Sequence, residues 1–157
     1  MRHSVVLTFL LTIIMNYETV AQEKETINWI TFEQLDDSLN TRPKKVLINF
    51  YADWCSYCKK MDRVSFTKPE IIQKINEEYY AVKMNAESTD TIAFDGATFT
   101  NKNSLTQRNA IHEIPTLLAS RKNTSFSLPA IIFLDETFKI RKRYFEYLSP
   151  KKLQSAL

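Results

Sequence analysis

The sequence predicts an α/β fold in a single domain. Segments with helical and with strand-like patterns alternate along most of the chain. An almost continuous apolar run at residues 46–52 is typical of a strand that is covered on both faces. With 157 residues, 44% of them hydrophobic, the chain can bury a substantial core without disulfide support. We therefore expect a sheet with helices packed against it.

The N-terminal residues have the pattern of a signal peptide. A basic start at residues 1–3 precedes an apolar stretch at 5–15, and Ala21 ends a group of small residues suited to cleavage. The apolar stretch is shorter than the ~20 residues that span a bilayer, which favours a signal peptide over a membrane anchor. We expect residues 1–21 to be removed and residues 22–157 to form an exported domain.

The first half of the predicted domain is regular. Thr31 is the expected N-cap of a helix, because Gln34 stands three positions later as in a capping box. The strand at 46–52 follows, and then a helix that ends near Val64. Pro69 favours the start of another helix, which leads into a strand at "YYAVKMN". A strand, helices and a second strand in succession predict a right-handed crossover and a parallel strand pair.

The middle of the chain is less regular. Asp95-Gly96 is flanked by alternating apolar and polar residues and predicts a hairpin. Ser104 and Gln107 form a second possible capping box ahead of apolar residues at helical spacing. Pro115 interrupts that spacing, so we expect a kinked or two-piece helix here.

The C-terminal part again has clear patterns. Residues 129–145 predict two strands around a turn at 135–137, and Ser149-Pro150 predicts the start of a last helix. The formal net charge of +3, with no long basic block, gives little reason to expect a nucleic-acid partner.

"ADWCSYCKK" contains both cysteines of the chain, Cys55 and Cys58, between the predicted strand and helix. A helix N-terminus favours a thiolate, so Cys55 is the expected exposed nucleophile, with a pKa lowered into the range of ~3.5–7.5. Cys58 is the expected shielded resolving thiol, and Lys59 adds positive charge nearby. A zinc site with the same spacing would need two more ligands, and His112 is the one histidine after residue 21. We therefore expect a redox couple and no metal, and His112 in the core or on a helix surface.

The stretch "VLINFYADWCSYCKKMDRVSFTKPEII" resembles the thioredoxin superfamily, and in particular the C-terminal thioredoxin-like domain of DsbD-type thiol:disulfide interchange proteins. The resemblance extends from about residue 43 to the C-terminus and is weakest over residues 85–125. It implies a thioredoxin fold, with a central mixed β-sheet flanked by helices. It also implies a redox-active Cys55–Cys58 disulfide and no other cofactor.

The resemblance implies a cis-proline that faces the two cysteines, and two prolines are candidates. Pro115 stands in an Ile-Pro-Thr motif like that of the family. Pro129, in contrast, is followed directly by the strand, turn, strand and helix that the family requires. We predict Pro129, with Leu128 before it binding the substrate chain. Residues 85–125 then form an insertion before the cis-proline, which either recognises a partner or covers a sheet edge.

Two further site residues follow from the resemblance. Trp54 is expected to be a partly buried lid on the motif and to shape the contact surface for substrate. Many thioredoxins bury an acid six residues before the first cysteine, and here Asn49 stands there. An amide cannot take a proton from Cys58 at neutral pH, so water or another group would have to do so.

The sequence as a whole predicts an exported, periplasmic or secreted thiol:disulfide oxidoreductase. We expect it to act on protein thiols and disulfides as a monomeric reductase or electron carrier, which would require a separate membrane electron donor. A disulfide oxidase or isomerase is one alternative. A non-catalytic peptide-binding or chaperone module with the same fold is another.

Overall fold

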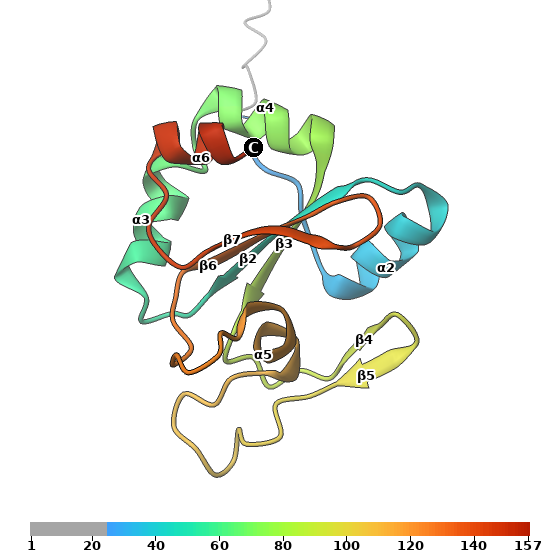
Figure 1. Ribbon diagram of the computed structural model, residues 1–157, viewed down its shortest axis with the longest axis vertical. Helices are drawn as coiled ribbons and strands as arrows, with labels where there is room; N and C mark the ends of the chain where they lie inside the picture. Colours follow the sequence, from blue (N-terminus) through green and yellow to red (C-terminus); the bar gives the residue numbers. More distant parts are fainter. Residues whose placement is uncertain (1–24) are drawn as a thin grey trace, which may run out of the picture.

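The computed structural model describes residues 25–157. The predicted signal peptide lies outside this part of the chain. Figure 1 shows a central sheet with helices on both sides and a small hairpin below it. In chain order the elements are β1 (Trp29–Ile30), α2 (Phe32–Thr41), β2 (Lys45–Tyr51), α3 (Ser56–Val64), α4 (Pro69–Glu78), β3 (Tyr79–Asn85), β4 (Ile92–Phe94), β5 (Ala97–Phe99), α5 (Glu113–Ala119), β6 (Ala130–Leu134), β7 (Ile140–Tyr144) and α6 (Pro150–Ala156).

The larger sheet is mixed and has the strand order β1-β3-β2-β6-β7. Strands β1, β3 and β2 are parallel, whereas β6 pairs antiparallel with β2, and β7 antiparallel with β6. The predicted α/β fold with a central mixed sheet flanked by helices is confirmed, as is the parallel pair of β2 and β3. The two-residue strand β1 is too short to leave a sequence pattern and was not predicted.

Each face of the sheet has its own apolar core. Helices α3, α4 and α6 lie on one face, where Met61, Ile71 and Leu153 are fully buried. Helix α2 and the short helix α5 lie on the other face, where Phe32 and Ile114 pack with side chains of the strands. Because both faces are covered, the buried strands read as continuous apolar runs in the sequence.

The predicted helix starts are confirmed where capping signals were clear. Thr31 and Gln34 form a reciprocal capping box, with backbone-to-side-chain distances of 2.9 and 3.2 Å. Pro69 occupies the first position of α4, where its missing N–H costs nothing. Ser149 caps α6 directly before Pro150.

The predicted kinked helix around Pro115 is wrong. Residues 102–109 form turns, Leu105 is 98% exposed, and the helix begins only at Glu113, after the N-cap His112. Pro115 lies in the first turn of α5, a position where a helix tolerates proline without a kink. The apolar spacing that suggested a longer helix therefore combines residues of a turn region with residues of a short helix.

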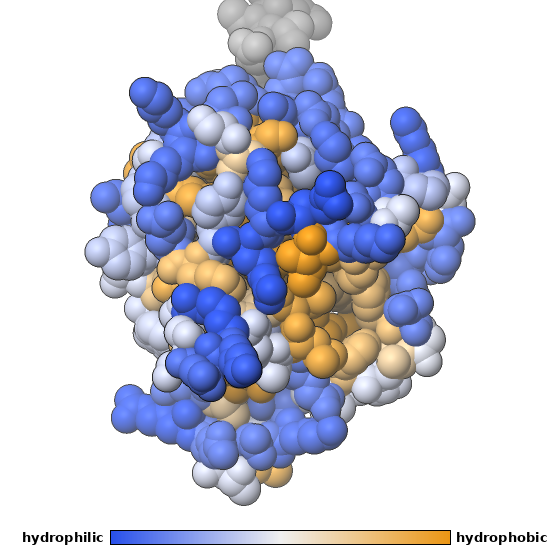
Figure 2. Space-filling view, viewed as in Figure 1, coloured by the Kyte–Doolittle hydropathy of each residue, from blue (hydrophilic) through white to orange (hydrophobic). Residues whose placement is uncertain are grey.

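The predicted hairpin at Asp95-Gly96 is confirmed by the antiparallel pair β4 and β5. Both turn residues have positive φ, 51° and 69°, as this type of tight turn requires. Between this hairpin, α2 and the β6–β7 turn, Figure 2 shows an apolar patch, which includes a groove of ≈ 170 Å³ lined by Phe94, Phe99 and Phe138. None of the helices formed by residues 25–157 has the length and apolar character needed to span a membrane.

Candidate redox-active site

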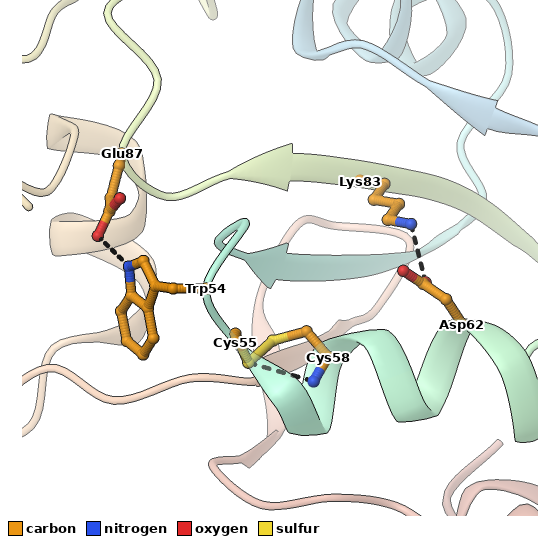
Figure 3. Close-up of a disulfide and its surroundings, with 6 residues drawn as sticks. All are labelled: Trp54, Cys55, Cys58, Asp62, Lys83 and Glu87. Atoms are coloured by element: carbon orange, nitrogen blue, oxygen red, sulfur yellow. Dashed lines mark hydrogen bonds and ion pairs between the residues drawn. A yellow bond between two sulfur atoms is a disulfide. The ribbon is translucent and has the colours of Figure 1, made fainter.

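The two cysteines lie where β2 ends and α3 begins (Figure 3). They form a disulfide with an S–S distance of 2.06 Å. Cys55 is the N-cap of α3, and its sulfur accepts a hydrogen bond from the backbone N–H of Cys58 at 3.1 Å. The first sulfur thus occupies the place of a capping oxygen, at the positive end of the helix dipole.

The expected difference in exposure between the two cysteines is wrong. Cys55 and Cys58 are both 3% exposed. The two residues share a small apolar cluster with Ala52, against which Tyr51 and Leu128 pack. Since Tyr51 and Leu128 pack against this cluster, Cys55 is buried although it is the first residue of the motif.

The peptide bond between Leu128 and Pro129 is cis, as predicted, and Pro115 lies instead in α5. Pro129 directly precedes β6, whose first residue, Ala130, pairs with Phe50 of β2. This register brings Leu128 to the end of the sheet from which the Cys-x-x-Cys loop emerges. Strand pairing between distant segments therefore brings the cis-proline segment to the disulfide.

Trp54 is more exposed than predicted. It is 59% exposed, and its indole N–H donates to Glu87 Oε1 at 2.7 Å. It is therefore an exposed side chain held by a surface hydrogen bond, and not a partly buried lid. Tyr57, within the motif, is likewise 61% exposed, and Lys59 is exposed on α3.

Asn49 is buried on the α3 side of the sheet. Side chains alternate along a strand, so Asn49 shares a face with Leu47, which packs in the same core as Met61 of α3. It is 2% exposed, and its Oδ1 has no hydrogen-bond partner among the described residues. An uncharged amide thus occupies the place in which many thioredoxins bury an acid.

An ion pair bridges β3 and α3 beyond this position. Lys83, which is paired with Asn49 across the two parallel strands, binds Asp62 at 2.8 Å (Figure 3). The lysine also lies over the Tyr51 ring, 5.1 Å from its centroid. Burial raises the pKa of the Tyr51 hydroxyl, and the negative charges of Asp53 and Asp62 raise it further. Tyr51 is therefore neutral at physiological pH.

Sequence reasoning missed Glu87, Asn109, Asp62 and Lys83. A usable signal existed for Glu87, because the ends of parallel strands meet at one edge of a sheet. Residues directly after β3 must therefore lie near residues directly after β2. Asn109 carried no such signal, since it approaches the site through a turn region.

The disulfide is the redox group that the structure contains. Across residues 25–157, no cluster of three or more histidine, cysteine, aspartate or glutamate side chains has the arrangement of a metal site. His112 is fully buried, with Nδ1 accepting from the N–H of Ile114 and Nε2 lying 3.1 Å from the carbonyl oxygen of Asp90.

Comparison with known families identifies the chain. A family model described as a thioredoxin-like domain matches residues 32–157. The chain belongs to this family. The thioredoxin fold and the Cys55–Cys58 disulfide together define a thiol-disulfide oxidoreductase.

Relatives and solved structures agree with this assignment. The thiol:disulfide interchange protein DsbD of Campylobacter jejuni (strain RM1221) is 29% identical over 79 residues, which are 48% of this chain and 14% of that protein. DsbD of Cronobacter sakazakii is 33% identical over 89 residues, 56% of this chain and 14% of that protein. The matched segment thus spans about a seventh of the length of these two DsbD relatives.

The oxidised DsbD C-terminal domain of Neisseria meningitidis has a TM-score of 0.51 at 20% identity, covering 79% of this chain and 87% of that one. A thioredoxin-fold protein from Helicobacter pylori has a TM-score of 0.56 at 17% identity, covering 87% of this chain and 76% of that one. At these identities the structural likeness supports the fold alone.

Proposed function

We propose that this protein is an exported reductase or electron carrier that exchanges its Cys55–Cys58 dithiol with disulfides of other proteins. The observation that carries the proposal is the sulfur of Cys55 at the N-cap of α3, where a backbone amide already donates to it. After reduction, the same amide and the helix dipole would stabilise the thiolate. Because the two cysteines are equally buried, this helix terminus is what distinguishes Cys55 as the nucleophile.

The proposed reaction consists of two exchanges. The Cys55 thiolate attacks one sulfur of a partner disulfide, forms a mixed disulfide and releases the other partner sulfur as a thiolate. Cys58 then loses its proton and attacks Cys55, which releases the second partner thiolate. The partner gains two electrons, and the protein is left with its own disulfide.

Several residues would support these steps. Leu128 packs against the disulfide and precedes the cis-proline Pro129, which supports a role for its backbone in pairing with a substrate chain. Trp54, which is exposed directly before Cys55, would also contact the substrate. Asn49 cannot accept a proton at neutral pH, so the proton of Cys58 would leave through water or another group. The exposed Lys59 adds positive charge in the first turns of α3.

Export and direction rest on the sequence and the relatives. The basic start and the apolar stretch at residues 5–15 favour export. The DsbD proteins of Campylobacter jejuni and Cronobacter sakazakii are named as thiol:disulfide interchange proteins, which supports disulfide exchange as the activity, and the reducing direction is our proposal. A reductant in an oxidising compartment must itself be re-reduced, so we propose a membrane protein as the electron donor.

An insulin-reduction assay with dithiothreitol as the electron source tests this function. The wild-type protein should accelerate insulin precipitation, and the Cys55→Ala, Cys58→Ala double variant should not. Equal rates for the two proteins would refute the enzymatic function and leave a peptide-binding module. Circular dichroism and thermal unfolding of the double variant should verify that it is folded.

A further inference from the structure

The exposed ring of Trp54 is held by residues that lie far from it in the sequence. Its N–H donates to Oε1 of Glu87, and the side-chain amide of Asn109 donates to the same oxygen, each at 2.7 Å. Glu87 is itself fixed, because its backbone N–H donates to the side chain of Asn85 at 2.9 Å. The carboxylate of Glu87 therefore connects the tryptophan of the redox motif with the segment after β5.

Asn109 belongs to loop 101–112, which is fixed at both ends by buried polar residues. Asn101 is 5% exposed, and its amide donates to the carbonyl oxygens of Ser88 and Ala110 at 3.1 and 2.8 Å. His112 is fully buried, and its backbone N–H donates to the carbonyl oxygen of Ala86 at 2.8 Å. Since these contacts reach residues 86–88 directly, the loop cannot shift without disturbing the neighbourhood of Glu87.

The loop lies at the end of the sheet where the disulfide lies. Figure 1 places residues 100–112 below α5, at the same end of the molecule as the N-terminus of α3. Figure 3 shows the Trp54 ring beside the disulfide, turned toward Glu87. A protein that docks over the buried cysteines would therefore contact this exposed ring, whereas a small disulfide needs much less of the surrounding surface.

We propose that Glu87 is a positioning residue for protein partners. Its carboxylate fixes the orientation of the Trp54 ring beside the disulfide, and the hydrogen bond from Asn109 holds Glu87 in place. A ring that is already fixed loses less conformational entropy when a partner binds against it. The inference rests on the proposed function, because it concerns exchange with protein disulfides. It assigns a role in partner selection to loop 101–112.

The test compares a protein disulfide with a small one. Rates are measured with insulin and with bis(2-hydroxyethyl) disulfide for the wild type, Glu87→Ala, Glu87→Gln and Asn109→Gly. Glu87→Ala should lower kcat/KM for insulin about threefold to tenfold, the range expected for the one hydrogen bond that Trp54 loses, and leave the small disulfide unchanged. Glu87→Gln keeps a carbonyl acceptor and should restore most of the rate with insulin. The reduction potential should be the same in all four proteins.

Asn109→Gly removes the hydrogen bond from Asn109 to Glu87 without straining the backbone, because Asn109 has a φ of 57° that glycine adopts readily. Asn123→Gly is its matched control, since Asn123 has a φ of 55° in another turn. Asn109→Gly should lower the insulin rate alone, and Asn123→Gly should change neither rate.

Equal losses with both disulfides, or no loss with insulin, would overturn the inference and leave the proposed function intact. A wild-type protein that reduces neither disulfide would instead refute the proposed function, and the inference with it.

Discussion

The two sides of the redox site are built in different ways. Strand β2 and helix α3, which carry the cysteines, are held by sheet hydrogen bonds on both sides of β2 and by buried apolar side chains. Residues 86–127 lie on the Trp54 side of the site and contain only short strands, one short helix and turns. Buried polar side chains such as Asn101 and His112 hold this region together. The two cysteines are therefore held by a rigid frame, which consists of β2 and α3. Residues 86–127 can vary without displacing this frame.

The largest predicted effect is the loss of disulfide exchange when one of the two cysteines held by this frame is replaced. Cys55→Ser should abolish disulfide exchange, because it removes the sulfur at the helix terminus. Cys58→Ser should still attack a partner but stop at the mixed disulfide. Non-reducing gels and mass spectrometry of trapped adducts would show which cysteine carries the partner. Adducts on Cys58 in the Cys55→Ser protein, and none on Cys55 in the converse variant, would reverse the assignment.

Two phenylalanines compare the stability of the regions. Phe50 on β2 is fully buried, so Phe50→Ala should lower the free energy of unfolding by about 3–5 kcal/mol. Phe99 on β5 is only partly buried, and Phe99→Ala should cost less than half as much. Urea unfolding of both variants measures the difference. Similar losses would mean that residues 86–127 are as tightly integrated as the frame.

Asn101 tests whether polar contacts hold residues 86–112 together. Asn101→Ala leaves two backbone carbonyls without their donor and should cost about 1–3 kcal/mol. Hydrogen exchange should show faster exchange in residues 86–112 and unchanged protection in β2. Uniformly faster exchange throughout the chain would contradict the separation of the two regions.

The smallest effect is a pH dependence at Glu113, where α5 begins. A hydrogen bond from Lys102, followed by one from the backbone N–H of Thr100, holds the pKa of this carboxyl below its ordinary value of 4.5. Because the folded-state pKa is the lower one, the stabilisation is complete above pH 4.5 and is lost as the pH falls through the folded-state value. The Glu113→Gln variant should therefore lose less stability than the wild type when the pH is lowered from neutral to acidic. Thermal unfolding of both proteins measures this difference. If the two proteins lost the same stability at acidic pH, the Glu113 contact would not contribute to the pH dependence.

The two regions also differ in how much the sequence predicted. The motif, the cap at Thr31 and the order of strands after Pro129 are local signals, and each led to the correct element or residue. The turn region around Leu105 was mistaken for helix, because its apolar spacing continued by chance into α5. The contact between Trp54 and Glu87 depends on strand pairing, and the burial of Cys55 depends on Leu128, so neither could be read from local pattern.

The central claim is that Cys55 and Cys58 form a redox couple that serves as a reductant. Its most direct test is the reduction potential of the folded protein, measured by equilibration with glutathione or dithiothreitol buffers and quantified by thiol alkylation. If the protein is a reductant, this value should be near that of thioredoxin, about −270 mV. A value near about −120 mV, typical of a strong disulfide oxidant, would contradict it.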